Sequence, residues 1–202
     1  MVENSSRIPF VNLGAAFETN TVEILDLVRE VGLSGHYILG DKVSAFEKNF
    51  STFIGTKHAV GVANGSDALF LIMKALGIGP GDEVVTQPNS FIASAWTIVA
   101  VGARPVFCDI DETLSLDHHK LPDVLTPRTK AIMPVHLAGN PANMSKLIPL
   151  AQNFGIPIIE DSAQAVGATY EDKKLGSFGI ASMFSLHPLK NLGVMGDGGV
   201  IT

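Results

Sequence analysis

The chain has 202 residues, 46% of them hydrophobic, and a formal net charge of −6. This length and hydrophobic content favour a folded domain with a substantial core and argue against disorder. The net negative charge and the scattered basic residues argue against general electrostatic binding to nucleic acid or to anionic lipid.

Three features predict a cytoplasmic protein. The N-terminal residues "MVENSSRIPF" lack the basic start and apolar core of a signal peptide. The longest apolar stretch, residues 91–103, falls short of the roughly 20 residues that a membrane-spanning helix needs. The single cysteine, Cys108, lies in an apolar run and cannot form an internal disulfide, which is typical of a reducing compartment.

The first 55 residues predict a helical lead-in. Residues 21–35 and 41–55 carry apolar side chains at three- and four-residue spacing, and each segment ends at a glycine, as helices often do. We therefore expect two helices before the main domain, which we place at residues 56–202.

From residue 56 onward, short apolar runs alternate with helical patterns. The predicted strands are "HAVGVAN", "DEVVTQP", "RPVFCDI", "TKAIMPVHLAG", "IPIIED", "IASMFSL" and "GGVIT". The predicted helices are "SDALFLIMKALGI", "SFIASAWTIVAVG" and "NMSKLIPLAQNFG". Strands joined by crossover helices predict an α/β fold with a mostly parallel seven-stranded sheet and helices on both faces.

In open sheets of this kind, ligands bind beyond the carboxyl ends of the strands. The polar residues that follow the apolar runs are therefore the candidates for a site. They are "NGSD" at 64–67, "QPNSF" at 87–91, His136, "EDSAQ" at 160–164 and "SLHPLK" at 185–190.

The segment around Gly65 and Ser66 lies where a strand gives way to a helix. The N-terminus of a helix presents free N–H groups, so a phosphate could bind there with the serine hydroxyl assisting. The alternative is ordinary helix capping by Asn64 or Ser66.

Two acids, Glu160 and Asp161, directly follow four apolar residues. A carboxylate at the end of a buried strand is costly to desolvate unless it meets a cation or hydrogen-bond donors, so a partner is implied. The alternative is that one acid faces solvent while the other caps the following turn.

Lys190 lies in the mostly apolar segment "SLHPLKNLGVMGDGG". A lysine shielded from water can supply the neutral amine that forms a Schiff base with an aldehyde, whereas the alternative is a plain surface lysine on a loop. Pyridoxal 5′-phosphate carries a phosphate, a ring nitrogen and an aldehyde. These three groups match a phosphate pocket with Ser66 and Ser185, an acid and a lysine amine. Phe91, after a strand end, could cover the ring.

The motifs in order resemble the DegT/DnrJ/StrS family of sugar aminotransferases. The likeness is carried by "GDKVSAFEKNFSTFIGTKHAVGVANGSDAL", "LGIGPGDEVVTQPNSFIASAWTIVAVGARPVFCDID", "TKAIMPVHLAGNPANM", "IIEDSAQAVGATY" and "FSLHPLKNLGVMGDGGVIT", and it runs from about Leu13 to the last residue. It implies the aspartate aminotransferase fold (fold type I), a homodimer and pyridoxal phosphate as cofactor. The implied reaction moves an amino group, usually from glutamate, to a keto group of a nucleotide-linked sugar, for lipopolysaccharide, other polysaccharides or antibiotic sugars.

The resemblance also implies roles for individual residues. Lys190 would hold the cofactor as a Schiff base and then shuttle the proton, and Asp161 would pair with the pyridinium nitrogen. Gln164 would lie near the 3-hydroxyl of the ring, and Phe91 would stack on it. The phosphate would be held by Gly65, Ser66, Ser185 and the backbone N–H of Asp67.

We expect the histidines of the chain to take no part in catalysis or metal binding. His136 matches a family motif, but a histidine at a strand end is more often structural, so we leave it out of the catalytic set. His187, His118 and His119 lack a cysteine or acid at ligand spacing, and we predict no metal site. The run "GVMGDGG" precedes a strand and lacks the following helix of a dinucleotide-binding loop.

Family members are longer than this chain, with a smaller C-terminal domain and a segment that reaches the neighbouring subunit's cofactor phosphate. We therefore expect the sequence to be a fragment or half of a split gene. One alternative function is a non-catalytic cofactor-binding or regulatory fragment of this fold. A sugar dehydratase is a lesser alternative, because a dehydrating relative carries histidine in place of the lysine.

Overall fold

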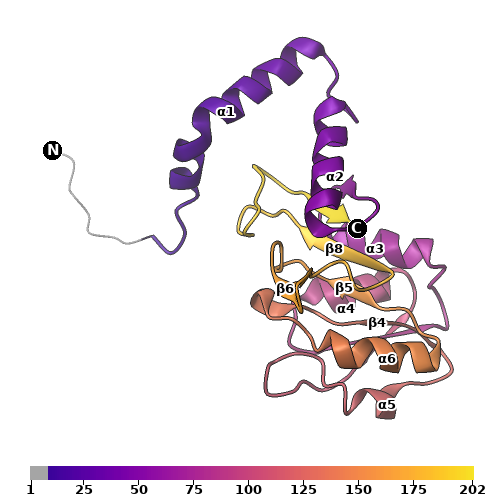
Figure 1. Ribbon diagram of the computed structural model, residues 1–202. Coiled ribbons are helices and arrows are strands. Elements are labelled where there is room, and N and C mark those ends of the chain that lie inside the picture. Colours follow the sequence, from indigo (N-terminus) through magenta and orange to yellow (C-terminus); the bar gives the residue numbers. More distant parts are fainter. Residues whose placement is uncertain (1–8) are drawn as a thin grey trace. The chain divides into compact units, whose positions relative to one another are not determined.

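The computed structural model describes residues 9–202 (Figure 1). The first eight residues, on which much of the argument against a signal peptide rests, lie outside the described part. Within residues 9–202, no helix combines the length and apolar character that crossing a membrane requires.

The chain separates into two compact units that divide between Ser44 and Ala45. The first unit contains α1 (Leu13–Ser34), which begins where the Asn12 side chain accepts a hydrogen bond from the Ala15 N–H and ends at Gly35 in the left-handed region. The second helix of the predicted lead-in, α2 (Asp41–Ile54), contains the division. The boundary predicted after residue 55 stays a prediction.

All seven predicted strands are present in the second unit. They are β1 (Val60–Val62), β2 (Glu83–Thr86), β3 (Arg104–Phe107), β4 (Thr129–Met133), β5 (Ile159–Asp161), β8 (Ala181–Ser185) and β9 (Gly199–Ile201). They form a four-stranded sheet in the order β1-β9-β8-β5 and a three-stranded sheet in the order β3-β2-β4. Isolated parallel bridges from Ile132 to Ile158 and from Val135 to Asp161 connect the β4 segment with the β5 segment.

The predicted sheet needs one correction, because it is mixed. Strand β9 pairs antiparallel with both β1 and β8, whereas the β2–β3, β2–β4 and β5–β8 pairs are parallel. No crossover helix separates β8 from β9, so the chain returns through a loop and pairs antiparallel. Two further strands were not predicted, β6 (Thr169–Tyr170) and β7 (Lys173–Lys174), which form a separate short hairpin.

Helices cover both faces of the sheet (Figure 1). The elements involved are α3 (Gly65–Ala75), α4 (Ile92–Ala100), α5 (Leu121–Val124) and α6 (Met144–Phe154), and a 3-10 turn, η1, spans Leu137–Gly139. Because strand side chains alternate, Val84 of β2 packs in the core that holds residues of α3 and α4. Its neighbour Val85 packs in the core that holds residues of α6.

Gly199 sets how closely β9 passes the start of α3. A Cβ atom added at Gly199 would lie 2.5 Å from both the carbonyl carbon and the carbonyl oxygen of Asn64, and 2.9 Å from the Gly65 nitrogen. These neighbours are backbone atoms, so they cannot move aside as the end of a side chain can. The absence of a side chain at Gly199 therefore lets the end of β8, through its pair Ser185–Gly199, lie beside the start of α3.

At the opposite end of the strands, a buried acid connects β2 with β3 and with the turn before β4. Glu83 is fully buried at the start of β2 and accepts hydrogen bonds from Arg104 at 2.5 Å, Arg128 at 2.8 Å and Thr126 at 2.6 Å. The hydrogen bonds from Thr126 and Arg104, only partly opposed by burial, lower the pKa of Glu83 to about 2.

We expect Gly199→Ala to destabilise the chain by about 1–3 kcal/mol, because the added methyl group meets rigid backbone. The free energy of unfolding from urea titration measures the loss. Gly79→Ala is the matched control, because its added Cβ would make only an ordinary contact, 3.7 Å from the Val101 carbonyl oxygen. Equal stability of the two variants would contradict the packing described for Gly199.

Glu83 predicts an acid-labile contribution to stability. Because its folded pKa, about 2, is below the ordinary value of 4.5, the contribution is present above pH 4.5 and is lost as the pH falls toward 2. Melting temperatures measured from pH 5 to pH 2 should therefore fall less steeply in Glu83→Gln than in the parent chain. Parallel curves would show that Glu83 is not the group responsible.

Candidate functional site

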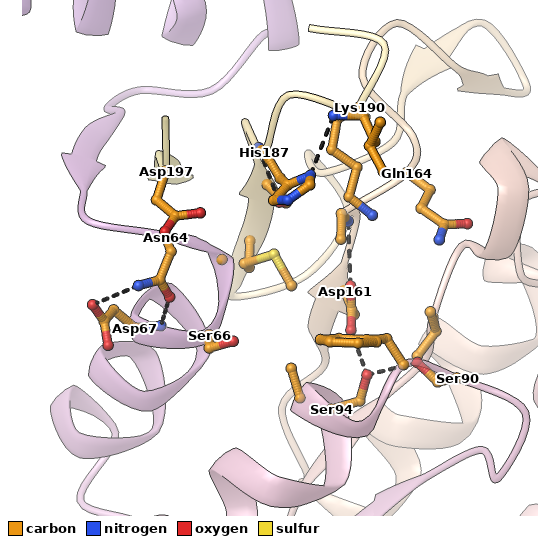
Figure 2. Close-up of a pocket in the computed structure, with 18 of the residues that line it drawn as sticks. Asn64, Ser66, Asp67, Ser90, Ser94, Asp161, Gln164, His187, Lys190 and Asp197 are labelled. Atoms are coloured by element: carbon orange, nitrogen blue, oxygen red, sulfur yellow. Dashed lines mark hydrogen bonds between the residues drawn. The ribbon is translucent and has the colours of Figure 1, made fainter. Parts of the chain in front are cut away.

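A cavity of about 620 Å³ opens at the carboxyl ends of the strands, between the start of α3, α4 and the loop after β8 (Figure 2). All eight residues predicted for the site line it. They are Gly65, Ser66, Asp67, Phe91, Asp161, Gln164, Ser185 and Lys190. The topology thus brings together residues spread over 126 positions of the sequence, from 65 to 190.

Asp161, the last residue of β5, provides a buried carboxylate on the cavity wall. Its side chain accepts a hydrogen bond from the Ser94 hydroxyl at 2.7 Å and another from the Ala163 N–H at 3.2 Å. Burial raises the pKa of Asp161 above its ordinary value, although these two donors and the nearby His136 and Lys190 oppose the rise.

Glu160 is also buried, but it is held by a different set of groups. It accepts hydrogen bonds from the N–H groups of Gly176, Phe178 and Gly179 at 2.7–2.8 Å, and His136 lies 3.1 Å away. Burial raises the pKa of Glu160, but the contacts from His136 and from the backbone N–H groups outweigh burial, so the pKa is lowered. The alternative in which one of the two acids faces solvent is therefore wrong.

His136 is one of the groups that hold Glu160, and it does not line the cavity. Its Nδ1 accepts a hydrogen bond from the Ala142 N–H at 3.1 Å, which places the ring proton on Nε2, where it points at Glu160. Its backbone N–H donates to the Asp161 carbonyl at 3.0 Å. His136 thus makes structural contacts, and its exclusion from the catalytic set stays a prediction.

Lys190 follows β8 on a turn in which its N–H donates to the His187 carbonyl at 2.8 Å. The residue is half-buried, and in Figure 2 its side chain extends toward the part of the cavity where Asp161 and Gln164 lie. Lys190 is also close enough to Asp161 to help lower the pKa of that carboxyl group. Its geometry is therefore that of a cavity lysine rather than of an outward-facing surface lysine.

Gln164 presents hydrogen-bond donors to the cavity. Its Oε1 accepts the Ala138 N–H at 2.7 Å, in a turn where Ala138 has a positive φ of 54°. Because the amide oxygen is used in this way, the Nε2 group is the end left to face the cavity, as Figure 2 shows.

The start of α3 forms another wall. The Asn64 side chain caps the helix by accepting the Asp67 N–H at 2.8 Å, as the capping alternative expected. The Asp67 N–H proposed for phosphate is thus already engaged, whereas the N–H groups of Gly65 and Ser66 belong to the first turn, which has no partner within its own helix. A Cβ at Gly65 would lie 3.0 Å from Met183 Sδ and 3.1 Å from Ser185 Cβ, so a larger residue here would require these neighbours to shift by a few tenths of an ångström.

The sequence analysis missed several residues that line the cavity. They include Ser94, Trp96, Leu137 and Asp197, whereas Ser90 and His187 lie in the candidate segments 87–91 and 185–190 but were given no role in the site. Ser94 matters most because it contacts Asp161 directly. The available signal was the spacing of four between Ser90, in the loop after a strand end, and Ser94, in the mostly apolar segment that follows.

The chain matches a known protein family and several of its members over most of its length. A family model described as the DegT/DnrJ/EryC1/StrS aminotransferase family matches residues 18–202. The dTDP-3-amino-3,4,6-trideoxy-alpha-D-glucose transaminase of Streptomyces venezuelae is 44% identical over 196 residues, covering 96% of this chain and 52% of the relative. The chain thus spans about half the length of the curated relatives it matches.

Solved structures of aminotransferases also superpose closely on this chain. DesV of S. venezuelae, in complex with a ketimine intermediate, superposes with a TM-score of 0.94 at 44% identity over 97% of this chain and 53% of its own. NtdA of Bacillus subtilis, with bound cofactor PMP, gives a TM-score of 0.91 at 34% identity over 98% of this chain and 45% of its own. Aminotransferases of this family depend on pyridoxal phosphate. The match over almost the whole chain, together with the cavity at the strand ends, shows that this chain belongs to the DegT/DnrJ/EryC1/StrS aminotransferase family.

Proposed function

We propose that the complete protein is a pyridoxal phosphate-dependent aminotransferase that transfers an amino group, with glutamate as donor, to a keto group of a nucleotide-linked sugar. The observation that carries this proposal is the shared cavity of the Lys190 amine and the buried Asp161 carboxylate. The dTDP-sugar named for the S. venezuelae relative supports the substrate class. We also propose a cytoplasmic location and a homodimer, as the resemblance implies.

The cavity residues fit the cofactor in three respects. A buried carboxylate suits a protonated ring nitrogen, and a lysine amine suits an aldehyde. The close approach at Gly65 brings the first turn of α3 beside Ser185, and this gives N–H and hydroxyl donors for a phosphate. When bound, pyridoxal phosphate supplies an aldehyde for amino-group exchange and a ring that takes up electrons from the reacting carbon.

Two residues carry the chemistry in this proposal. Lys190 holds the cofactor covalently through Nζ and, once released, moves the proton at the carbon that gains or loses the amino group. Asp161 keeps the ring nitrogen protonated, because an ionised carboxylate favours the cation beside it. Its burial strengthens that pairing, since few water molecules compete for either charge.

The other cavity residues bind and orient. The Gln164 Nε2 group donates to the oxygen on the ring, and Phe91, whose side chain is largely exposed at the mouth, covers one ring face. Ser66, Ser185 and the first N–H groups of α3 bind the phosphate. The Asp67 N–H joins them only if the Asn64 side chain releases it.

One observation favours the alternative that this chain alone is a non-catalytic fragment. Among the described residues that line the cavity, Lys190 is the only lysine or arginine, whereas Asp67 and Asp197 add negative charge. A phosphate dianion beside them would benefit from a cation supplied by the remaining half of the protein or by a second subunit. We would test the 202-residue chain separately for visible absorbance and for amino transfer. Pyridoxal phosphate absorbance without transfer would favour the fragment alternative for this chain.

The proposed function predicts that Lys190→Ala abolishes amino transfer in the complete enzyme. We expect turnover with glutamate and a panel of nucleotide-linked keto-sugars to fall by at least about 10³-fold, because both the covalent tether and the proton carrier are lost. Non-covalent cofactor binding should persist, and chromatography of the aminated sugar measures the loss.

Lys146→Ala is the control, because Lys146 is an exposed lysine on α6 outside the cavity. It should retain the parent rate. Transfer by Lys190→Ala at the parent rate would refute the assignment.

A further inference from the structure

A chain of three side chains leads from α4 and the loop before it to the proposed ring-facing acid. The hydroxyl oxygens of Ser90 and Ser94 lie 2.7 Å apart, and Ser94 Oγ lies 2.7 Å from Asp161 Oδ2. Figure 2 shows both contacts as a continuous path below Asp161. Ser94 is 2% exposed and Asp161 is 3% exposed, so the contact between them is shielded from water.

The direction of these hydrogen bonds follows from chemistry. An ionised carboxylate has no proton to give, so the Ser94 hydroxyl donates to Asp161. The Ser94 oxygen is then free to accept from Ser90, whose hydroxyl donates to it. Donation at both steps polarises the pair of hydroxyls toward the carboxylate, which strengthens the bond to the charged form.

We propose that Ser94 is a positioning residue that holds the Asp161 carboxylate ionised and fixes its orientation toward the cavity, with Ser90 supporting it. This inference rests on the function proposed above for Asp161. Ser94 acts through Asp161 and not on the substrate.

The surroundings of Asp161 explain why such a donor is needed. Burial favours the neutral carboxylic acid, and a neutral acid would not hold a protonated ring nitrogen. The groups that oppose burial are Ser94 from α4, the Ala163 N–H from the following turn, His136 from the segment after β4 and Lys190 from the loop after β8. Among them the Ser94 hydroxyl has the largest effect on the pKa of Asp161.

Helix α4 offers a contrasting hydroxyl. Thr97 is fully buried, but its hydroxyl donates to the Ala93 carbonyl at 2.8 Å, the common helical arrangement that serves no other element. The Ser94 hydroxyl instead leaves its own helix and meets the end of β5. Loss of the Ser94 hydroxyl removes a contact with Asp161, whereas loss of the Thr97 hydroxyl removes only a contact within α4. A comparison of the two variants therefore distinguishes an effect on Asp161 from an effect on the packing of α4.

The experiment compares Ser94→Ala, Ser94→Thr and Thr97→Val with the parent chain. The first readout is the pH titration of the Asp161 carboxyl carbon by ¹³C NMR in the cofactor-free protein, assigned with Asp161→Asn. We expect Ser94→Ala to raise the Asp161 pKa by about one pH unit or more, because a hydrogen bond to a charged group is lost. Ser94→Thr, which keeps a hydroxyl, and Thr97→Val should both titrate like the parent.

The second readout is the dissociation constant for pyridoxal phosphate, from its visible absorbance. Ser94→Ala should bind about tenfold more weakly than Ser94→Thr, which corresponds to the same pH-unit shift. An Asp161 titration in Ser94→Ala that matches Thr97→Val would overturn the proposal. If the parent chain binds no pyridoxal phosphate, the cofactor part of the proposed function fails for this chain, while the titration still decides the role of Ser94.

Discussion

Two adjacent carboxylates at the end of β5 are the constraint on which the site depends. Side chains alternate along a strand, so Glu160 and Asp161 point to opposite sides of the sheet. Asp161 reaches the cavity and the hydroxyl of α4, whereas Glu160 reaches His136 and the N–H groups of residues 176–179. Asp161 therefore faces the cavity, whereas Glu160 is engaged in structural contacts.

The structural acid connects the segments that carry the rest of the site. Glu160 holds the chain just before β8, and β8 leads directly to Ser185 and Lys190. On the other side, His136 joins Glu160 to the segment after β4, whose backbone also bonds to the Asp161 carbonyl. Neutralisation of Glu160 would leave three buried N–H groups with a poorer acceptor, so this acid supports the positions of both the lysine and Asp161.

The sequence allowed prediction of the elements better than of their arrangement. Apolar runs such as "ASMFS" identified each sheet strand, but the antiparallel placement of β9 depends on pairing across the sheet, which no local pattern reports. The hairpin of β6 and β7 has two residues per strand, too few for a period to appear. In the site, strand-end polar residues located the cavity, whereas Ser94 was missed because the feature that singles it out is its contact with Asp161, 67 positions away.

The covalent bond proposed for Lys190 can be tested by trapping. The protein is incubated with pyridoxal phosphate, reduced with sodium borohydride and digested, and peptide mass spectrometry then locates the modified lysine. We expect a near-stoichiometric adduct on Lys190, with only traces on exposed lysines such as Lys146. Bound cofactor with an unmodified Lys190, or with adducts spread evenly over the surface lysines, would contradict it.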